Sequence, residues 1–232
     1  MAELAVEKYV AECIGTFFLV LTIGCCVING VPFAPLAIGG ILMVMIFAMG
    51  SVSGAHFNPA VTTSVLISGR QKITPQDACL YMLAQLVGGL LAGLVYWYLT
   101  GLTFALAPGK THNWLDASVA EMFFTCALCF VVLNTATTKE DSPNHYFGLA
   151  IGFTVMASAF AIGSISGASL NPAVSFGSLM VHGIRTGGGW VYFPLYLLVP
   201  FVGSALAAGL FYLVRPAEYG WKRAEGDYRQ IR

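Results

Sequence analysis

Two asparagines, each followed by a proline, are the residues of this chain whose type and setting are best suited to chemistry. Asn58 lies in Ser-Gly-Ala-His-Phe-Asn-Pro-Ala at 53–60, and Asn171 lies in Ser-Gly-Ala-Ser-Leu-Asn-Pro-Ala at 166–173. Asparagine is a favoured N-cap and proline a favoured first helical residue, so each side-chain oxygen is expected to cap its own helix. The amide NH₂ of each asparagine would then remain free to donate elsewhere. Two copies in matched surroundings indicate a built site.

The elements that carry these asparagines are predicted to be half-length helices. Short apolar runs follow the two Asn-Pro pairs, at 61–67 and 174–181, and they are bounded by Ser-Gly-Arg and by His-Gly. Both runs are shorter than the roughly 20 residues that cross a bilayer. They therefore predict helices that enter a membrane without crossing it.

Composition indicates that the whole chain lies in a bilayer. Hydrophobic residues make up 57% of it and charged residues 9%, and the mean hydropathy is +0.77. Windows of about 20 apolar residues predict six membrane-spanning helices, near 13–35, 36–57, 78–101, 122–138, 146–165 and 190–214. The first window lacks the basic leader and cleavage site of a removable signal peptide, so it is expected to stay as a helix.

Basic residues predict the orientation of these helices. With the amino terminus in the cytoplasm, nine Lys and Arg residues lie inside and only Lys110 and Arg185 outside, in agreement with the positive-inside rule. Both termini are therefore expected to be cytoplasmic; which membrane holds the protein is not encoded. The zero formal net charge hides this asymmetry between the two sides of the membrane. The sequence has no basic patch interleaved with aromatic residues, so no nucleic-acid partner is expected.

The two halves of the chain share more than the Asn-Pro phrase. Ala-Glu-Cys-Ile-Gly-Thr at 11–16 recurs as Ala-Glu-Met-Phe-Phe-Thr at 120–125. Each half thus holds three spans and one half-helix, and an odd number of spans turns the second copy upside down. The predicted fold is an all-α integral membrane channel built as an inverted repeat. It forms one domain over 1–232, with repeats at about 8–101 and 116–214 and a cytoplasmic tail at about 215–232.

An inverted repeat brings the amino ends of the two half-helices together near the membrane midplane. Non-helical backbone is tolerated at that depth only when it is buried in protein or lines a watery cavity, which here predicts a pore. Two facing helix amino ends disfavour cations and protons, and Asn58 and Asn171 add two donors for the oxygen of a passing water. The alternative is that both segments are re-entrant caps that only pack a transporter core.

These residues resemble those of the aquaporin, or major intrinsic protein, family. The resemblance rests on Ser-Gly-Xaa-His-Xaa-Asn-Pro-Ala-Val-Thr at 53–62, on the second Asn-Pro-Ala at 171–173 and on Glu12 and Glu121. It implies six helices around one pore in each monomer of a homotetramer in a lipid bilayer, which passes water and sometimes glycerol or other small neutral solutes. It also places the pore midpoint at Asn58, Pro59, Ala60, Asn171, Pro172 and Ala173.

The chain departs from this family at the outer selectivity filter. The position after the second Asn-Pro-Ala, ordinarily an arginine, is Val174, and the spacing of the family gives Ile38, Ala159 and Ala168 as the other filter residues. These four side chains imply a wider, apolar opening that would pass glycerol, urea, ammonia or hydrogen peroxide as well as water. If the opening is narrow, it would instead admit water alone or gate by dewetting. Ser175 and short loops resemble the water-channel branch, whereas Tyr196 resembles the glycerol branch.

Three ionisable residues near these motifs need a role. Glu12 and Glu121 are expected within spans, where an unpaired carboxylate costs about 3 kcal/mol. A proton relay is one hypothesis, but the resemblance implies that each carboxylate holds the backbone of a dipping loop. His56 is predicted to line the inner vestibule or to pack a loop.

Three classes of function stay open at this point. A passive channel for water and small uncharged solutes fits every strong feature. A secondary transporter would need ionisable groups around a central site, and an ion channel would need rings of charged side chains or a filter of backbone carbonyls. The chain offers no nucleophile, base and oxyanion constellation of an enzyme, and its six cysteines lack the spacing of a metal site. No cofactor or metal is therefore expected.

Overall fold

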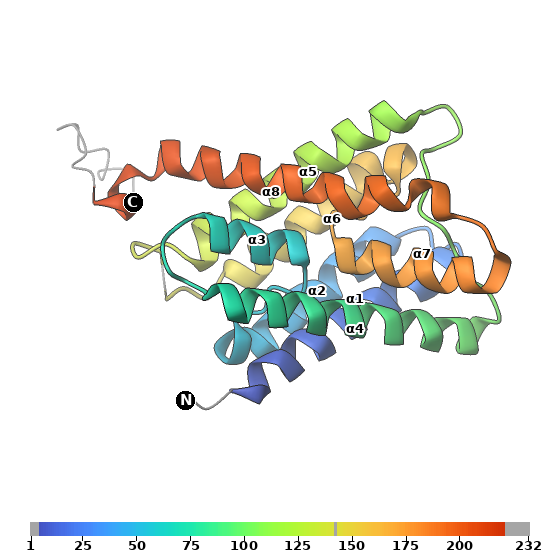
Figure 1. Cartoon of the computed structure of the whole chain (residues 1–232), viewed down its shortest axis with the longest axis horizontal. Coiled ribbons are helices and arrows are strands. Elements are labelled where there is room, and N and C mark those ends of the chain that lie inside the picture. Colours follow the sequence, from blue (N-terminus) through green and yellow to red (C-terminus); the bar gives the residue numbers. More distant parts are fainter. Residues whose placement is uncertain (1–4, 142, 221–232) are drawn as a thin grey trace.

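The fold consists of helices that lie side by side along one axis (Figure 1). The computed structural model describes residues 5–141 and 143–220 of the 232-residue chain. Six of the helices in these ranges are long and apolar enough to cross a membrane. The long helices are α1 (Val6–Ile28), α2 (Ala34–Ser53), α4 (Pro75–Thr100), α5 (Trp114–Ala136), α6 (Phe147–Ser166) and α8 (Phe193–Val214). The short ones are α3 (Pro59–Ile67) and α7 (Pro172–Thr186), with 3₁₀ turns η1 (Trp190–Tyr192) and η2 (Pro216–Tyr219).

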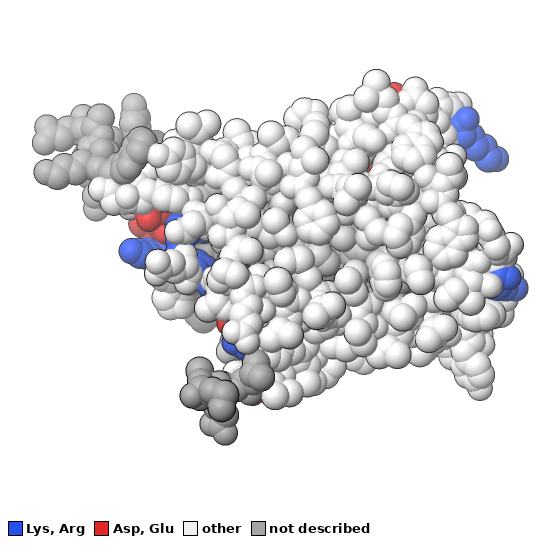
Figure 2. All heavy atoms as spheres, viewed as in Figure 1, with Lys and Arg blue, Asp and Glu red and all other residues white. Residues whose placement is uncertain are grey.

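The distribution of charge matches a protein that spans a bilayer. Figure 2 shows almost all Lys, Arg, Asp and Glu side chains of this face at two opposite ends, with a broad band between them that carries other residues. Large apolar side chains are exposed on the long helices, among them Leu83, Leu99, Phe123, Phe153 and Leu198. In water such a surface would be unfavourable, but in lipid it is the expected outer face. The chain is an integral membrane protein.

The order of elements repeats, and the short helix of each half packs against a long helix of the other half. In the first half α1 packs against α2 and α4, and in the second α5 packs against α6 and α8. The short helix α3 packs against α8 of the other half, and α7 packs against α4. In Figure 1, α3 and α7 enter from opposite ends and their amino ends face each other. The predicted fold of six spans and two half-helices in an inverted repeat is confirmed.

Local sequence signals explain where the helices next to the short segments stop and start. Gly54 ends α2 and Gly167 ends α6, with φ of 85° and 86°, a left-handed conformation that glycine adopts without steric cost. Asn113 and Asp116 form a capping box at the start of α5. The matched glycines turn the chain inward at the same point of each half.

Several predicted boundaries were wrong. The first span runs from Val6 to Ile28 and not over 13–35, and α5 begins at Trp114 and not near 122. The charge of Lys8 in the first turn of α1 is paired with Asp77 at 2.9 Å. The second half-helix continues past the expected stop at His-Gly to Thr186. Gly183 lies within α7, where a Cβ would overlap the Trp190 ring, and Gly187, with φ of 74°, makes the turn instead.

Candidate transport site

The two Asn-Pro pairs meet at the centre of the molecule. The Oδ1 atom of Asn58 accepts from the Ala60 N–H at 2.8 Å, and that of Asn171 accepts from the Ala173 N–H at 2.9 Å. The predicted N-caps are thereby confirmed. Proline as the first residue of α3 and α7 costs nothing there, because that N–H has no intrahelical partner anyway.

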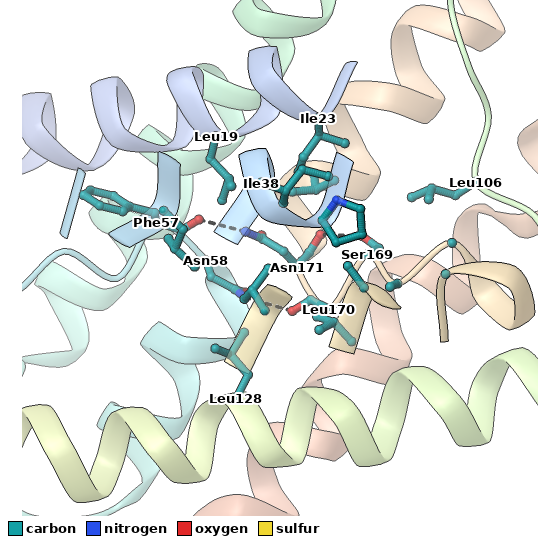
Figure 3. Close-up of a pocket in the computed structure, with 18 of the residues that line it drawn as sticks. Leu19, Ile23, Ile38, Phe57, Asn58, Leu106, Leu128, Ser169, Leu170 and Asn171 are labelled. Carbon is teal, nitrogen blue, oxygen red and sulfur yellow. Dashed lines mark hydrogen bonds between the residues drawn. The ribbon is translucent and has the colours of Figure 1, made fainter. Parts of the chain in front are cut away.

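The amide NH₂ groups are less free than predicted. Asn58 Nδ2 donates to the Leu170 carbonyl at 2.8 Å, and Asn171 Nδ2 donates to the Phe57 carbonyl at 2.9 Å, so each asparagine is bonded to the loop of the other half. Figure 3 shows these two bonds side by side. An amide NH₂ carries two hydrogens, and these bonds use one of each pair. One donor per asparagine is left for a passing molecule.

The loops before the two asparagines share an unusual backbone. Ala55 and Phe57 have φ of 54° and 49°, and Ala168 and Leu170 have φ of 50° and 53°. The left-handed region is unfavourable for residues with a Cβ, by about 1–3 kcal/mol each. Strain repeated at matched positions of both loops persists only where the surroundings hold it.

Two buried carboxylates hold these loops. Both oxygens of Glu12 accept from the first loop, from the His56 N–H at 2.9 Å and the Phe57 N–H at 2.7 Å. Glu121 accepts from the Ser169 N–H at 2.9 Å and the Leu170 N–H at 2.7 Å. Both glutamates are fully buried. Without these acceptors the buried N–H groups would be unsatisfied, at a cost of about 1–3 kcal/mol each, which is comparable to the backbone strain.

Hydroxyl groups complete the support of each loop. Ser53 Oγ donates to Glu12 at 2.6 Å, and Ser166 Oγ donates to Glu121 at 2.7 Å. The carbonyls of these two serines accept from tyrosine hydroxyls, Tyr81 at 2.7 Å and Tyr196 at 2.5 Å. The tyrosine pair was missed at the sequence level. The two tyrosines lie at similar places, near the starts of the third and sixth spans. That similarity could have predicted the pair.

The support differs between the halves at one point. Gln85 Nε2 donates to Glu12 at 2.7 Å and to the Thr62 hydroxyl at 3.0 Å. The position of α8 that corresponds to Gln85, by the spacing of the two tyrosines, is Pro200, which has no donor. Gln85 therefore supports the first loop alone.

One cavity of about 300 Å³ connects the asparagines with the predicted filter. Its lining includes all four predicted filter residues, Ile38, Ala159, Ala168 and Val174, together with Asn58, Asn171 and His56. Figure 3 shows Leu19, Ile23 and Ile38 on one side of the asparagines and Leu128 on the other. The cavity wall is thus mainly aliphatic, with polar groups gathered at the two loops.

The loop between α4 and α5 also reaches this cavity, which sequence reasoning missed. Phe104, Ala105, Leu106 and Ala107 are part of the lining, and Leu106 is buried against Gly167. The Gly109 N–H donates to the Ile165 carbonyl at 2.8 Å, in an approach so close that a Cβ at 109 would overlap the Ser164 carbonyl. Loops are usually polar, so the mainly apolar residues from Leu102 to Ala107 could have indicated that this loop is buried.

His56 lies at the cavity wall, and its place in an inner vestibule stays a prediction. Its Nδ1 is 3.1 Å from the Thr62 hydroxyl. The second half places Ser169 and Ser175 at the matched positions, with their hydroxyl oxygens 2.6 Å apart. His56 thus packs its loop and also borders the cavity.

Charge is nearly missing from the site. Among the described residues, no Asp, Glu, Lys or Arg lines the cavity, and no group of three His, Cys, Asp or Glu side chains could hold a metal ion. The amino ends of α3 and α7 direct partial positive charge toward the midpoint. The arrangement can offer hydrogen bonds to a neutral molecule, and it opposes the entry of a cation.

Comparisons with known proteins agree with this architecture. The model of the family described as major intrinsic protein matches residues 2–212. The chain is 37% identical over 219 residues to probable aquaporin NIP4-2 of Arabidopsis thaliana, covering 89% of this chain and 73% of that one. It is 32% identical over 235 residues to aquaporin AqpM of Methanothermobacter thermautotrophicus, with coverage of 87% and 94%.

A solved structure shows the same fold. The X-ray structure of the aquaglyceroporin from Plasmodium falciparum matches with a TM-score of 0.77 and 22% sequence identity, over 94% of this chain and 100% of that one. The match of the family model along nearly the whole chain, together with these relatives, accounts for the paired Asn-Pro-Ala loops and the inverted halves. The chain belongs to the major intrinsic protein family.

Proposed function

We propose that the protein is a passive channel for water and small uncharged solutes. The observation that carries this proposal is the pair of Asn58 and Asn171 amides at the facing ends of α3 and α7, in an aliphatic cavity whose described lining has no charged side chain. A water that crosses this point can accept one hydrogen bond from each amide. Its own hydrogens then point away from the centre, which interrupts a proton wire. The names of the aquaporin relatives support the same function.

Osmotic measurements test this proposal directly. Purified full-length protein in liposomes is expected to speed osmotic shrinkage, with a low activation energy and without any ion gradient. Planar-bilayer recordings of the same preparation are expected to show little cation or proton current at neutral pH. Flux that needs a proton or sodium gradient would identify a secondary transporter, and robust single-channel currents would identify an ion channel.

The filter supports a solute range wider than water. Ile38, Ala159, Ala168 and Val174 bring no hydrogen-bonding side chain to the cavity, so solutes are expected to be selected by size and by their cost of dehydration. Glycerol, urea, ammonia and hydrogen peroxide are the proposed candidates. Leu106 is the observation that favours the alternative, a narrow pore that passes water alone, because this side chain is buried beside the filter loop.

The substitution Val174→Arg separates the two filter hypotheses. An arginine adds bulk and a fixed set of donors, so it is expected to lower glycerol and urea permeability about tenfold or more while it lowers water permeability less. Parallel stopped-flow measurements of water and solutes in wild type and variant give the comparison. Val174→Met, which adds bulk without donors, is the matched control. A wild type that passes only water would refute the wide filter and leave the channel itself intact.

The assembly and orientation proposed here follow from the family and from charge. Lys8, Arg70, Lys72, Lys139 and Arg215 support a cytoplasmic location for both termini by the positive-inside rule. Of the expected tail, residues 221–232 lie outside the described residues. A homotetramer in the bilayer, with one pore in each monomer, is the proposed assembly. Labelling of single cysteines introduced at 71 and 110, in a variant whose six native cysteines are replaced by alanine, tests the orientation in intact and opened cells.

A further inference from the structure

One end of α3 is fastened by a buried ion pair that does not belong to the repeat. Arg70, three residues beyond the end of α3, is paired with Glu218 of η2 at 3.0 Å, and their side chains are only 4% and 6% exposed. Most other supports of the pore loops come in pairs, as the glutamates, serines and tyrosines show; Gln85 is the exception. The position that corresponds to Arg70 after Asn171 is Gly183. Among the described residues no ion pair fastens α7 to another element.

The Arg70 guanidinium joins four elements at this point. It donates to the Thr137 carbonyl at 3.2 Å and to the Thr137 hydroxyl at the end of α5. Its central carbon lies 4.1 Å from the centre of the Phe211 ring of α8. Arginine suits such a site because its planar fork donates in several fixed directions and stacks on aromatic rings. The end of α3 is thereby fixed to α5, α8 and η2 at once.

Glu218 and Tyr219 of η2 both bond to the segment at the carboxyl end of α3. Glu218 also accepts from the Lys139 N–H at 2.7 Å, and the Tyr219 hydroxyl donates to the Ser68 carbonyl, at the C-cap of α3, at 2.9 Å. Burial raises the pKa of the Glu218 carboxyl, but the Lys139 N–H and the Arg70 guanidinium outweigh it and hold the pKa below its ordinary value. The carboxylate is therefore charged at neutral pH and stays paired.

We propose that Arg70 and Glu218 are positioning residues for transport, which set the place of Asn58 by fastening the far end of its helix to η2. The proposal rests on the proposed channel function. α3 has only nine residues, so a displacement of its carboxyl end is carried to Asn58 at its amino end. A packed helix transmits such a shift because protein interiors are close-packed. The segment after the last span is thus part of the pore mechanism.

Point variants of the full-length protein test this coupling. Arg70→Gln and Glu218→Gln each leave one buried charge unpaired, and each is expected to lower water permeability per channel about fivefold. The double variant leaves no unpaired charge and is expected to be no worse than either single variant. Asp77→Asn, which breaks the ion pair between Lys8 and Asp77 without touching α3, is the matched control and is expected to conduct as wild type does.

The readout must separate positioning from mere stability. Liposome shrinkage is divided by the number of channels counted in the same vesicles, and the activation energy of water flow is measured alongside. A loss of stability lowers the number of channels, whereas a displaced Asn58 lowers the flow through each folded channel and raises its activation energy. Unchanged or increased flow per channel in the single variants would overturn the proposal, and so would single effects that multiply in the double variant.

A milder variant allows the same test if Arg70→Gln and Glu218→Gln do not fold. Tyr219→Phe removes only the hydroxyl that bonds the Ser68 carbonyl, and a fall of about twofold in flow per channel is expected. No fall in that variant would overturn the proposal. The wild type serves as the reference for the channel itself. If it conducts no water, the proposed function fails, whereas a conducting wild type with indifferent variants refutes the positioning role alone.

Discussion

Replacement of Glu121 by leucine is expected to destabilise the protein strongly. The leucine leaves the Ser169 and Leu170 N–H groups and the Ser166 hydroxyl without their acceptor, in a loop that has two left-handed non-glycine residues. Three buried donors left without an acceptor, at about 1–3 kcal/mol each, are expected to lower the unfolding free energy by about 4 kcal/mol or more. The midpoint of thermal unfolding in detergent measures the effect.

A second carboxylate on the same helix provides the control. Asp116 belongs to the exposed capping box of α5, and Asp116→Asn is expected to change stability by about 1 kcal/mol or less. Glu121→Gln keeps one oxygen acceptor and is expected to fall between the two. If Glu121→Leu unfolds at the wild-type temperature, the carboxylate does not hold the loop, and the proton-relay hypothesis regains weight.

Replacement of either asparagine by leucine is expected to reduce water flow through each channel about tenfold or more. Asn58→Leu removes the donor to the Leu170 carbonyl and the donor left for water, and Asn171→Leu does the same at the Phe57 carbonyl. A water at the midpoint would then lose hydrogen bonds that nothing in the aliphatic wall replaces. Stopped-flow shrinkage of liposomes, normalised to the number of channels, gives the measurement.

Loss of the cap must be separated from loss of the donor. Asn58→Asp keeps an oxygen for the Ala60 N–H but has no NH₂, so its flow is expected to fall while the amino end of α3 stays capped. Asn29→Leu changes an exposed asparagine outside the cavity and is expected to leave the flow unchanged. Normal flow in the leucine variants of both Asn58 and Asn171 would show that the constriction lies elsewhere.

Local signals in the sequence were enough to predict the fold. An Asn-Pro pair before an apolar run specifies a helix start from neighbouring residues alone, and the repeat of such pairs carries the inverted topology. The spacing of the family placed Ile38, Ala159, Ala168 and Val174, and all four line one cavity. Helix ends were less predictable, since Gly183 is required by close packing against Trp190 within α7 and does not mark a helix end.

Contacts between distant segments account for what the sequence did not predict. The bond between Asn58 and Leu170 joins residues 112 positions apart, and the bond between Arg70 and Glu218 joins residues 148 positions apart. No periodicity or capping rule links such partners. Leu106 was missed for a similar reason, because the fold brings a loop with no regular structure against Gly167.

The crossed amide bonds at the midpoint also bear on how the protein is made. Asn58 needs the Leu170 carbonyl and Asn171 needs the Phe57 carbonyl, so neither loop can complete its own hydrogen bonds. Ribosomes deliver the first half of the chain to the membrane well before the second. With the first half alone, the Asn58 amide and the Phe57 carbonyl lack the partners that they have in the folded protein. The pore is therefore complete only when the second half has joined the first.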